Sequence, residues 1–169
     1  GSDGIKEEIV QIRHASKPKH IKKHLEWINE CIKDSIRDGI DIWKRRNEFY
    51  PSLLFCQSVR QQLYKIYQSH VILNRIKRSL SELQKYCENW VTGGFEPENI
   101  TGKPRMESKP TLQQYGKERT FVCPDGKQRK FSWHLSLSYT WRLYFYPLEK
   151  EKKIIIGYIG QHLPIVSEK

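Results

Sequence analysis

Apolar residues recur at every third or fourth position through the first half of the chain, which is the spacing of amphipathic helices. This spacing predicts three helices, at residues 18–43, 52–67 and 72–90. Pro18 suits a first helical turn, and Pro51 disfavours helical geometry at the residue before it. The adjacent glycines Gly93 and Gly94 supply the left-handed backbone conformation that commonly ends a helix. The front of the chain, residues 1–93, is therefore expected to be a helical region.

The spacing changes to every second position beyond residue 117, which indicates a sheet. Strands are expected at residues 119–123, 128–137, 140–146 and 154–159. The continuous apolar run in the last of them is typical of a buried central strand. Residues 94–117 are rich in Gly, Pro, Asn, Ser and Thr, so they are expected to form a connecting loop. The sequence thus predicts an α+β fold in which three main helices precede a small antiparallel sheet at residues 118–169.

Composition adds that the chain is basic and able to form a core. Of its 169 residues, 30 are Lys or Arg and 19 are Asp or Glu, which gives a formal net charge of +11. Apolar residues make up 37% and aromatic residues 12%, enough to fill a core. No apolar run approaches the roughly 18 residues of a membrane-spanning helix. These features exclude an acidic disordered tail and a membrane-spanning protein, and they favour a polyanionic partner.

The four cysteines give no sign of a metal site. Cys31, Cys56, Cys87 and Cys123 are far apart and lack the close spacing of zinc ligands, so reduced and packed thiols are expected. With no secretory leader at the start, a cytoplasmic location is expected. No metal and no cofactor are expected. The first two residues, Gly-Ser, resemble the scar of a cleaved tag, which leaves open that the chain is a fragment of a longer parent protein.

Basic residues dominate the middle of the helical region, because the chain has no acidic residue from position 49 to position 81. The candidate nucleic-acid-binding residues are Lys44, Arg45, Arg46, Arg60, Lys65, Arg75, Lys77 and Arg78. One sign of charge on helices suits a phosphate backbone, where each neutralised phosphate releases counterions. The partner expected from this pattern is RNA or the ribosome, with DNA not excluded. The alternative is a solvated basic face that binds nothing.

Residues suited to acid and base chemistry converge in the predicted sheet. Strand alternation places Arg142 and Tyr144 on one face of the third strand. Lys130 and His134 share a face of the strand before it, and His162 follows the last strand. A cluster of Lys, Arg, Tyr and His without a carboxylate suits cleavage of RNA without a metal. These five residues are therefore the candidate catalytic group, with Lys130, His134, Arg142 and Tyr144 expected on one exposed surface and His162 just after the last strand.

Each candidate has a chemical role in that hypothesis. His134 and His162 transfer protons to and from the 2′-hydroxyl and the leaving oxygen, and Arg142 and Lys130 stabilise the phosphate. Tyr144 assists by hydrogen bonding or by stacking on a base, and Tyr146 and Tyr158 are further candidates for base contacts. The alternative for every one of these residues is structural, because Tyr and Arg often cover a small sheet and a terminal His often only bonds a loop.

The end of the chain resembles the closing hairpin of the RelE/ParE superfamily of bacterial toxins. The resemblance rests on Arg142 in the strand before the turn, the apolar run at 154–156, and a glycine-containing exit that ends at His162. It covers the last third of the chain. It implies a small toxin sheet and, in the RelE branch, ribosome-dependent cleavage of mRNA without a metal. In the ParE branch it implies gyrase as the target.

The function expected from these patterns is an RNA-directed, metal-independent endoribonuclease that resembles RelE-type toxins, with the ribosome as a candidate requirement. A protein antidote, as in toxin–antitoxin pairs, is a candidate partner. The alternative is a non-catalytic nucleic-acid-binding module of a larger bacterial defence or mobile-element protein. A third interpretation, which follows the ParE side of the resemblance, is a protein-interaction domain that inhibits an enzyme such as gyrase.

Overall fold

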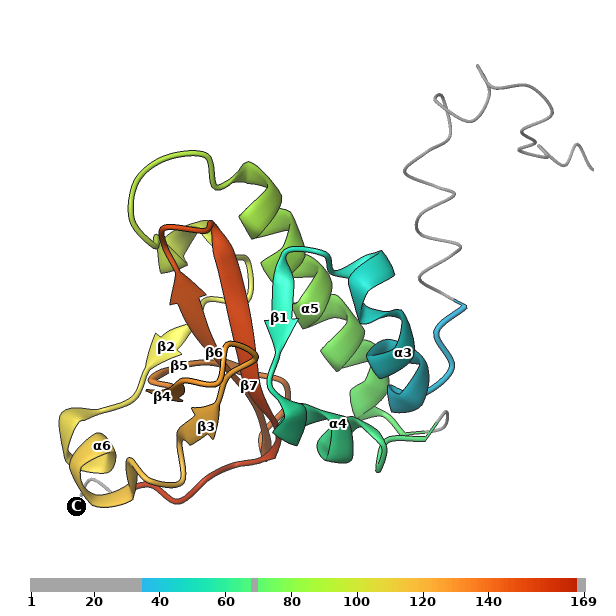
Figure 1. Cartoon of the computed structure of the whole chain (residues 1–169). Helices are drawn as coiled ribbons and strands as arrows, with labels where there is room; N and C mark the ends of the chain where they lie inside the picture. Colours follow the sequence, from blue (N-terminus) through green and yellow to red (C-terminus); the bar gives the residue numbers. More distant parts are fainter. Residues whose placement is uncertain (1–34, 68–69, 167–169) are drawn as a thin grey trace, which may run out of the picture. The chain divides into compact units, whose positions relative to one another are not determined.

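The computed structural model describes residues 35–67 and 70–166, and within them the chain from Ile36 onward belongs to one compact unit (Figure 1). The helices are α3 (Gly39–Phe49), α4 (Gln57–Leu63), α5 (Ile72–Asn89) and α6 (Lys109–Tyr115), with a 3-10 turn η1 (Pro97–Asn99). The strands are β1 (Leu53–Phe55), β2 (Arg105–Met106), β3 (Thr120–Val122), β4 (Gln128–Lys130), β5 (Trp133–Ser136), β6 (Trp141–Leu148) and β7 (Lys153–Gln161).

The main sheet has five strands in the order β1-β7-β6-β5-β2, and β3 and β4 form a separate two-stranded hairpin. Neighbours in the main sheet are antiparallel except β1 and β7, which are parallel. The predicted α+β class, with helices mainly before the sheet, is confirmed. The sheet is mixed, however, and not purely antiparallel as expected. The last strand of the chain, β7, lies inside the sheet between β1 and β6, as its apolar run indicated.

The predicted helix over residues 52–67 is wrong in its first part. Leu53 and Phe55 are buried on a strand whose backbone pairs with Ile154 and Ile156 of β7. Their spacing suits a helix and a short strand equally well, and pairing with β7 decides between the two. Only the segment from Gln57 to Leu63 is helical.

The predicted helix over residues 18–43 also differs where the structure describes it; residues 18–34 lie outside the described residues. Asp38 has an extended backbone and its carboxylate accepts a hydrogen bond from the Asp41 amide at 2.8 Å, so a helix begins here. That helix, α3, continues to Phe49, past the expected end. Its first residue must be Gly39, because a Cβ there would lie 2.0 Å from the carbonyl oxygen of Leu63.

Helix α5 supplies much of the core through the apolar face that its spacing predicted, with Ile76, Leu80 and Leu83 fully buried. It lies against the sheet (Figure 1). An aromatic chain continues the contact at its end, because Phe95 packs on Tyr86 of α5 at 5.5 Å and on Phe145 of β6 at 5.8 Å between ring centroids. This face of the sheet is therefore closed by α5 and the segment after it.

The segment 94–117 is more ordered than the loop expected there, since it contains η1, β2 and α6. The predicted strand 128–137 is divided between two sheets, with a break around the fully buried Phe131. Phe131 and Phe121 of the β3–β4 hairpin cover β7 on the face away from α5. A Cβ on Gly157 would meet both rings, at 2.6 Å and 2.8 Å, so a glycine allows this close contact.

The outer edge of β7 is covered in two ways. β1 pairs with residues 154–156, and beyond them two side chains of α4 take over the hydrogen bonds. The Ser58 hydroxyl donates to the Gly157 carbonyl at 3.1 Å, and the Gln62 side-chain oxygen accepts from the Ile159 amide at 2.8 Å. Backbone groups of a buried strand need such partners.

Among the described helices, none has the length and apolar character needed to cross a membrane.

Candidate functional site

The strand register gathers polar side chains on the sheet face away from α5. His134 of β5 lies directly opposite Arg105 of β2 and Tyr144 of β6, and Tyr144 lies opposite Tyr158 of β7. Residues directly opposite one another share a face of a sheet. The next row contains Arg142. The structure thus brings three of the five candidate catalytic residues, His134, Arg142 and Tyr144, onto one face, as their alternation predicted.

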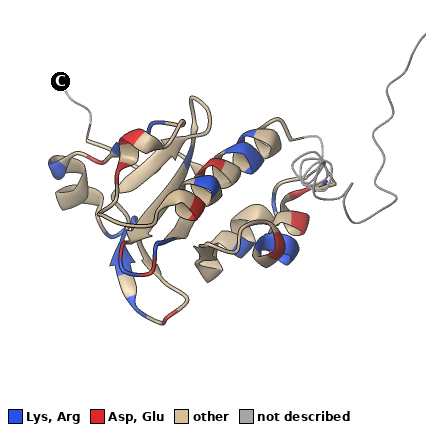
Figure 2. Ribbon diagram, turned by 90° about the horizontal axis from the view of Figure 1, so that it is seen from above, with Lys and Arg blue, Asp and Glu red and all other residues tan. Residues whose placement is uncertain are grey.

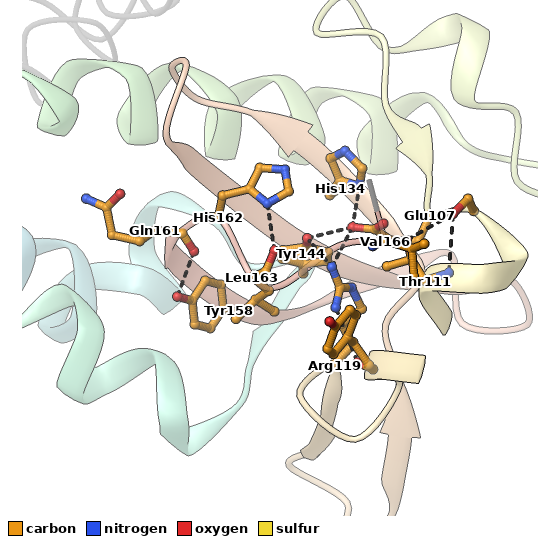
Figure 3. A network of polar contacts seen from close by, with 12 residues as sticks. Glu107, Thr111, Arg119, His134, Tyr144, Tyr158, Gln161, His162, Leu163 and Val166 are labelled. Carbon is orange, nitrogen blue, oxygen red and sulfur yellow. Dashed lines mark hydrogen bonds and ion pairs between the residues drawn. The ribbon is translucent and has the colours of Figure 1, made fainter. Parts of the chain in front are cut away.

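A buried carboxylate organises this face, although the sequence indicated a cluster without one. Glu107, just after β2, accepts a hydrogen bond from the Tyr144 hydroxyl at 2.6 Å and from Nη2 of Arg119 at 3.1 Å, both on its Oε1 atom (Figure 3). Nη1 of Arg119 donates to the carbonyl of Tyr115 at 3.2 Å. The Arg119 side chain is fully buried and that of Glu107 is 6% exposed. The expectation of a carboxylate-free cluster is therefore wrong.

Tyr144 is buried, whereas the sequence predicted that it would be exposed. Burial raises the pKa of its hydroxyl well above the ordinary value, and the hydrogen bond to Glu107 adds to the effect. A neutral hydroxyl that donates to a buried carboxylate supports the structure of the face and does not reach a ligand. Tyr158 is half-buried, because its ring stacks on Phe121 at 6.0 Å and its hydroxyl donates to the carbonyl of Gln161 at 2.9 Å.

His134 is a neutral imidazole at neutral pH. Burial is the main cause that lowers its pKa to about 4, and the charges of Arg142, His162 and Arg119 act in the same direction. Its Nδ1 atom lies 3.6 Å from Oε1 of Glu107, a separation that favours the protonated form. Burial outweighs this attraction because that oxygen is already bound to Tyr144 and Arg119, and Nδ1 has no hydrogen-bond partner among the described residues.

The pKa of His134 makes the stability of the fold depend on pH. Since its folded pKa is about 4 and its ordinary value is 6.5, the unfolded chain binds the extra proton between these two values. The free energy of unfolding is expected to fall by about 2–3 kcal/mol as the pH is lowered from 6.5 to 4, measured by urea unfolding. A His134→Gln variant should show a shallower decline, and an identical decline would contradict the assignment.

His162 lies at the end of β7 with its ring fixed in place. Its backbone amide donates to the Thr140 carbonyl at 2.7 Å, and its ring Nδ1 lies 2.7 Å from the Leu163 carbonyl oxygen. A carbonyl only accepts, so Nδ1 carries the proton and Nε2 of the neutral ring keeps its lone pair. Figure 3 shows the rings of His162 and His134 on the same side of the sheet. Strand alternation selected His134 and the position after the last strand selected His162, and the charge of His162 acts on His134.

The two proposed phosphate cations are placed differently. One terminal nitrogen of Arg142 donates to the carbonyls of Ser138 and Trp141, at 2.8 Å and 2.9 Å, so the guanidinium is partly engaged but its charge remains beside the histidines. Lys130 lies on β4 in the separate hairpin, opposite Thr120. The break between β4 and β5 means that Lys130 and His134 do not share one strand as expected, and a Cβ on Gly116 would lie 3.0 Å from the Lys130 ammonium nitrogen, beside the end of α6.

The basic residues of the helices differ in how much of their charge is available. Lys44, Arg60 and Lys65 are exposed. Four others have partners: Arg45 pairs with Glu48 at 2.8 Å, Arg78 pairs with Glu82 at 3.1 Å, Arg75 donates to the Leu137 carbonyl at 3.0 Å, and Arg46 lies 4.0 Å from the Trp43 ring centroid. Lys77 is half-buried. Helix α5 consequently shows both signs of charge (Figure 2).

Two clefts in the described part lie away from the histidines. One, of about 370 Å³, is at the end of α5 and is lined by residues that include Tyr86 and Trp90. The other, of about 560 Å³, is at the end of β6 and is lined by residues that include Trp133 and Tyr146. The site around His162 is therefore a surface of the sheet and is not part of either cleft.

The sequence did not single out two residues of the network, Glu107 and Arg119. Glu107 falls in a segment without periodicity, so no pattern placed it on the sheet. No group of three or more His, Cys, Asp or Glu side chains in the described ranges is arranged to hold a metal ion.

Comparison of the chain with known protein families, with curated protein sequences and with solved structures finds no match in any of the three.

Proposed function

We propose that this chain binds RNA and cleaves it on the sheet face that carries His162. The observation that carries the proposal is the hydrogen bond between Nδ1 of His162 and the Leu163 carbonyl, which leaves Nε2 as a proton acceptor beside a second histidine and an arginine. Arg142 and His162, two of the features on which the RelE/ParE resemblance rests, belong to this same site. Within the described ranges, 22 Lys and Arg stand against 12 Asp and Glu, a charge that suits a polyanionic substrate.

The proposed reaction is an internal transfer within the RNA strand. Nε2 of His162 accepts the proton of a 2′-hydroxyl, and the 2′-oxygen forms a bond to the adjacent phosphorus. The bond from phosphorus to the 5′-oxygen breaks, water at this open surface protonates the leaving oxygen, and the products end in a 2′,3′-cyclic phosphate and a 5′-hydroxyl. The positive charge of Arg142 stabilises the phosphate as negative charge grows on it.

Three roles differ from those expected from the sequence. Tyr144 supports the face through Glu107, since it is buried, and Lys130 is separated from the strand of His134 by the break between β4 and β5, so its proposed role at the phosphate loses the strand alternation on which it rested. His134 is neutral at neutral pH, so it serves as a hydrogen-bonding neighbour and does not donate a proton there. His162 is therefore the residue on which the proposed reaction depends.

The test is an RNA cleavage assay on the full chain, in a chelator, with and without ribosomes. The expected product carries a cyclic phosphate, and His162→Gln should lower the rate by about 10²–10⁴-fold. The matched control is His70→Gln, because His70 packs on Trp141 and does not belong to the polar face. Undiminished cleavage by His162→Gln, or no cleavage by the parent protein in either condition, would overturn the proposal.

A second candidate function, non-catalytic binding of nucleic acid through the helices, is favoured by the exposure of Lys44, Arg60 and Lys65. This function needs no proton transfer, so RNA would be retained at low salt, released at high salt and never shortened. Replacing the three residues with Gln would weaken retention and reduce its salt dependence, whereas His162→Gln would leave both unchanged.

A further inference from the structure

The outer edge of β6 is open near its end. β5 pairs with β6 only along residues 142–145, and in the described part of the chain no strand pairs with the outer side of Tyr146, Pro147 and Leu148. The cleft of about 560 Å³ lies at this edge. We call it the β6-edge cleft, and the residues of its lining that matter here are Phe95, Arg129, Trp133, Tyr146, Pro147 and Lys150.

An extended peptide is a poor occupant for this cleft. An added strand needs backbone donors along the edge, and Pro147, in the middle of the open stretch, has no N–H group. Proline on an edge strand is a common way to prevent strand addition. The occupant must therefore be recognised by the side chains of the lining.

Those side chains suit a flat aromatic ligand. Phe95, Trp133 and Tyr146 are each partly exposed. Phe95 meets Trp133 edge-to-face, with ring centroids 5.2 Å apart, and the guanidinium of Arg129 lies 5.7 Å from the centroid of Tyr146. Aromatic rings next to an arginine are the usual means of binding unpaired bases in a sequence-tolerant way, because every base has a π-face.

The charge at the cleft is mixed, because its lining contains Arg129 and Lys150 as well as Glu149 and Glu151. Lys150 of the β6–β7 turn is exposed, and so is Glu151 beside it. The carboxylate of Asp125 binds Arg129 through two hydrogen bonds, of 2.7 Å and 2.6 Å. The carboxylate of Glu149 accepts from the Phe95 amide at 3.0 Å. Arg129 and Glu149 are thus engaged inside the protein, and Lys150 is the exposed cation of the lining.

We propose that the β6-edge cleft holds one unpaired base of a single-stranded RNA, with Lys150 at the adjacent phosphate. This inference rests on the proposed function only in taking RNA as the ligand. His162 and the cleft lie toward opposite ends of β6, so base capture and cleavage would occupy different parts of one strand of RNA.

The test measures binding of a 2′-O-methylated single-stranded RNA oligonucleotide, which cannot be cleaved through its 2′-oxygen. Tyr146→Leu keeps apolar volume and removes the ring, and it should weaken binding about tenfold without a change in salt dependence. Tyr139→Leu is the matched control, because Tyr139 is 96% exposed outside the cleft, and it should bind as the parent does. Binding of inorganic polyphosphate, which has no bases, should be equal in all three proteins.

The outcomes separate this proposal from the proposed function. Unchanged oligonucleotide binding by Tyr146→Leu, an equal loss for polyphosphate, or no binding by the parent would overturn the cleft assignment. A 4-thiouridine oligonucleotide should crosslink to a peptide that contains Trp133 or Tyr146, and crosslinks confined to other segments would also overturn it. If the ring removal weakens binding while no RNA is ever cleaved, the cleft assignment stands and the ribonuclease fails.

Discussion

Replacing Arg119 with methionine is expected to lower the free energy of unfolding by about 3–5 kcal/mol. The Arg119 side chain is fully buried and pairs with Glu107, so its removal leaves a carboxylate in the interior without a compensating charge. The Tyr115 carbonyl loses a donor as well. Urea unfolding at neutral pH measures the loss.

Two variants test whether this loss comes from the buried charge. Arg78→Met breaks an ion pair with Glu82 in which Arg78 is 75% exposed, and it should cost less than about 1 kcal/mol. Combining Arg119→Met with Glu107→Gln should recover part of the loss, because no unpaired charge is left inside. A loss below about 1 kcal/mol in Arg119→Met alone would show that the network does not stabilise the fold.

Replacing Phe131 with alanine is expected to cost about 3–5 kcal/mol, because the ring is fully buried where the β3–β4 hairpin covers the sheet. The ring packs on Phe121 at 5.3 Å and on Tyr146 at 5.9 Å between centroids, and it fills the space left by the missing side chain of Gly157. The rigid strands on either side limit how far the cavity can collapse. Urea unfolding, read as a shift of the transition midpoint, measures this effect.

Val122→Ala is the matched control for this variant, since Val122 belongs to the same hairpin but is 54% exposed. Its expected effect is within about 0.5 kcal/mol. Equal effects of the two substitutions would mean that the hairpin is not anchored through Phe131. Such a result would also weaken the β6-edge cleft, whose wall includes Arg129 of the same hairpin.

The sequence predicted the long periodic elements well and the short ones poorly. α5 has enough turns for its apolar face to be read without ambiguity, and β7 has an unbroken apolar run. β1 has three residues, and its state depends on a partner far along the chain, so local spacing could not identify it. α6 did carry a local signal, because Ser108 caps it and Pro110 lies in its first turn.

The same reasoning explains which site residues could be found. His134, Arg142 and Tyr144 were placed on one face by alternation alone, since their strands pair in regular register. Glu107 follows a strand of two residues, which shows no period, so its position beside Arg119 depends on tertiary packing. Alternation could not predict the burial of Tyr144 either. It shows which residues share a face of the sheet, but whether that face is exposed to solvent depends on the segments that pack over it.

The central place of β7 has a consequence for folding during synthesis. Its neighbours on one side, β1 and α4, are made long before it; Ser58 and its partner Gly157 are 99 residues apart. On the ribosome, the apolar residues of β1 and the apolar face of α5 therefore stay exposed to solvent until β7 has been synthesised and the sheet can form. Pairings between segments far apart in the sequence slow folding and prolong the exposure of aggregation-prone apolar surface. A nascent chain of this protein is thus expected to depend on chaperones until β7 has emerged.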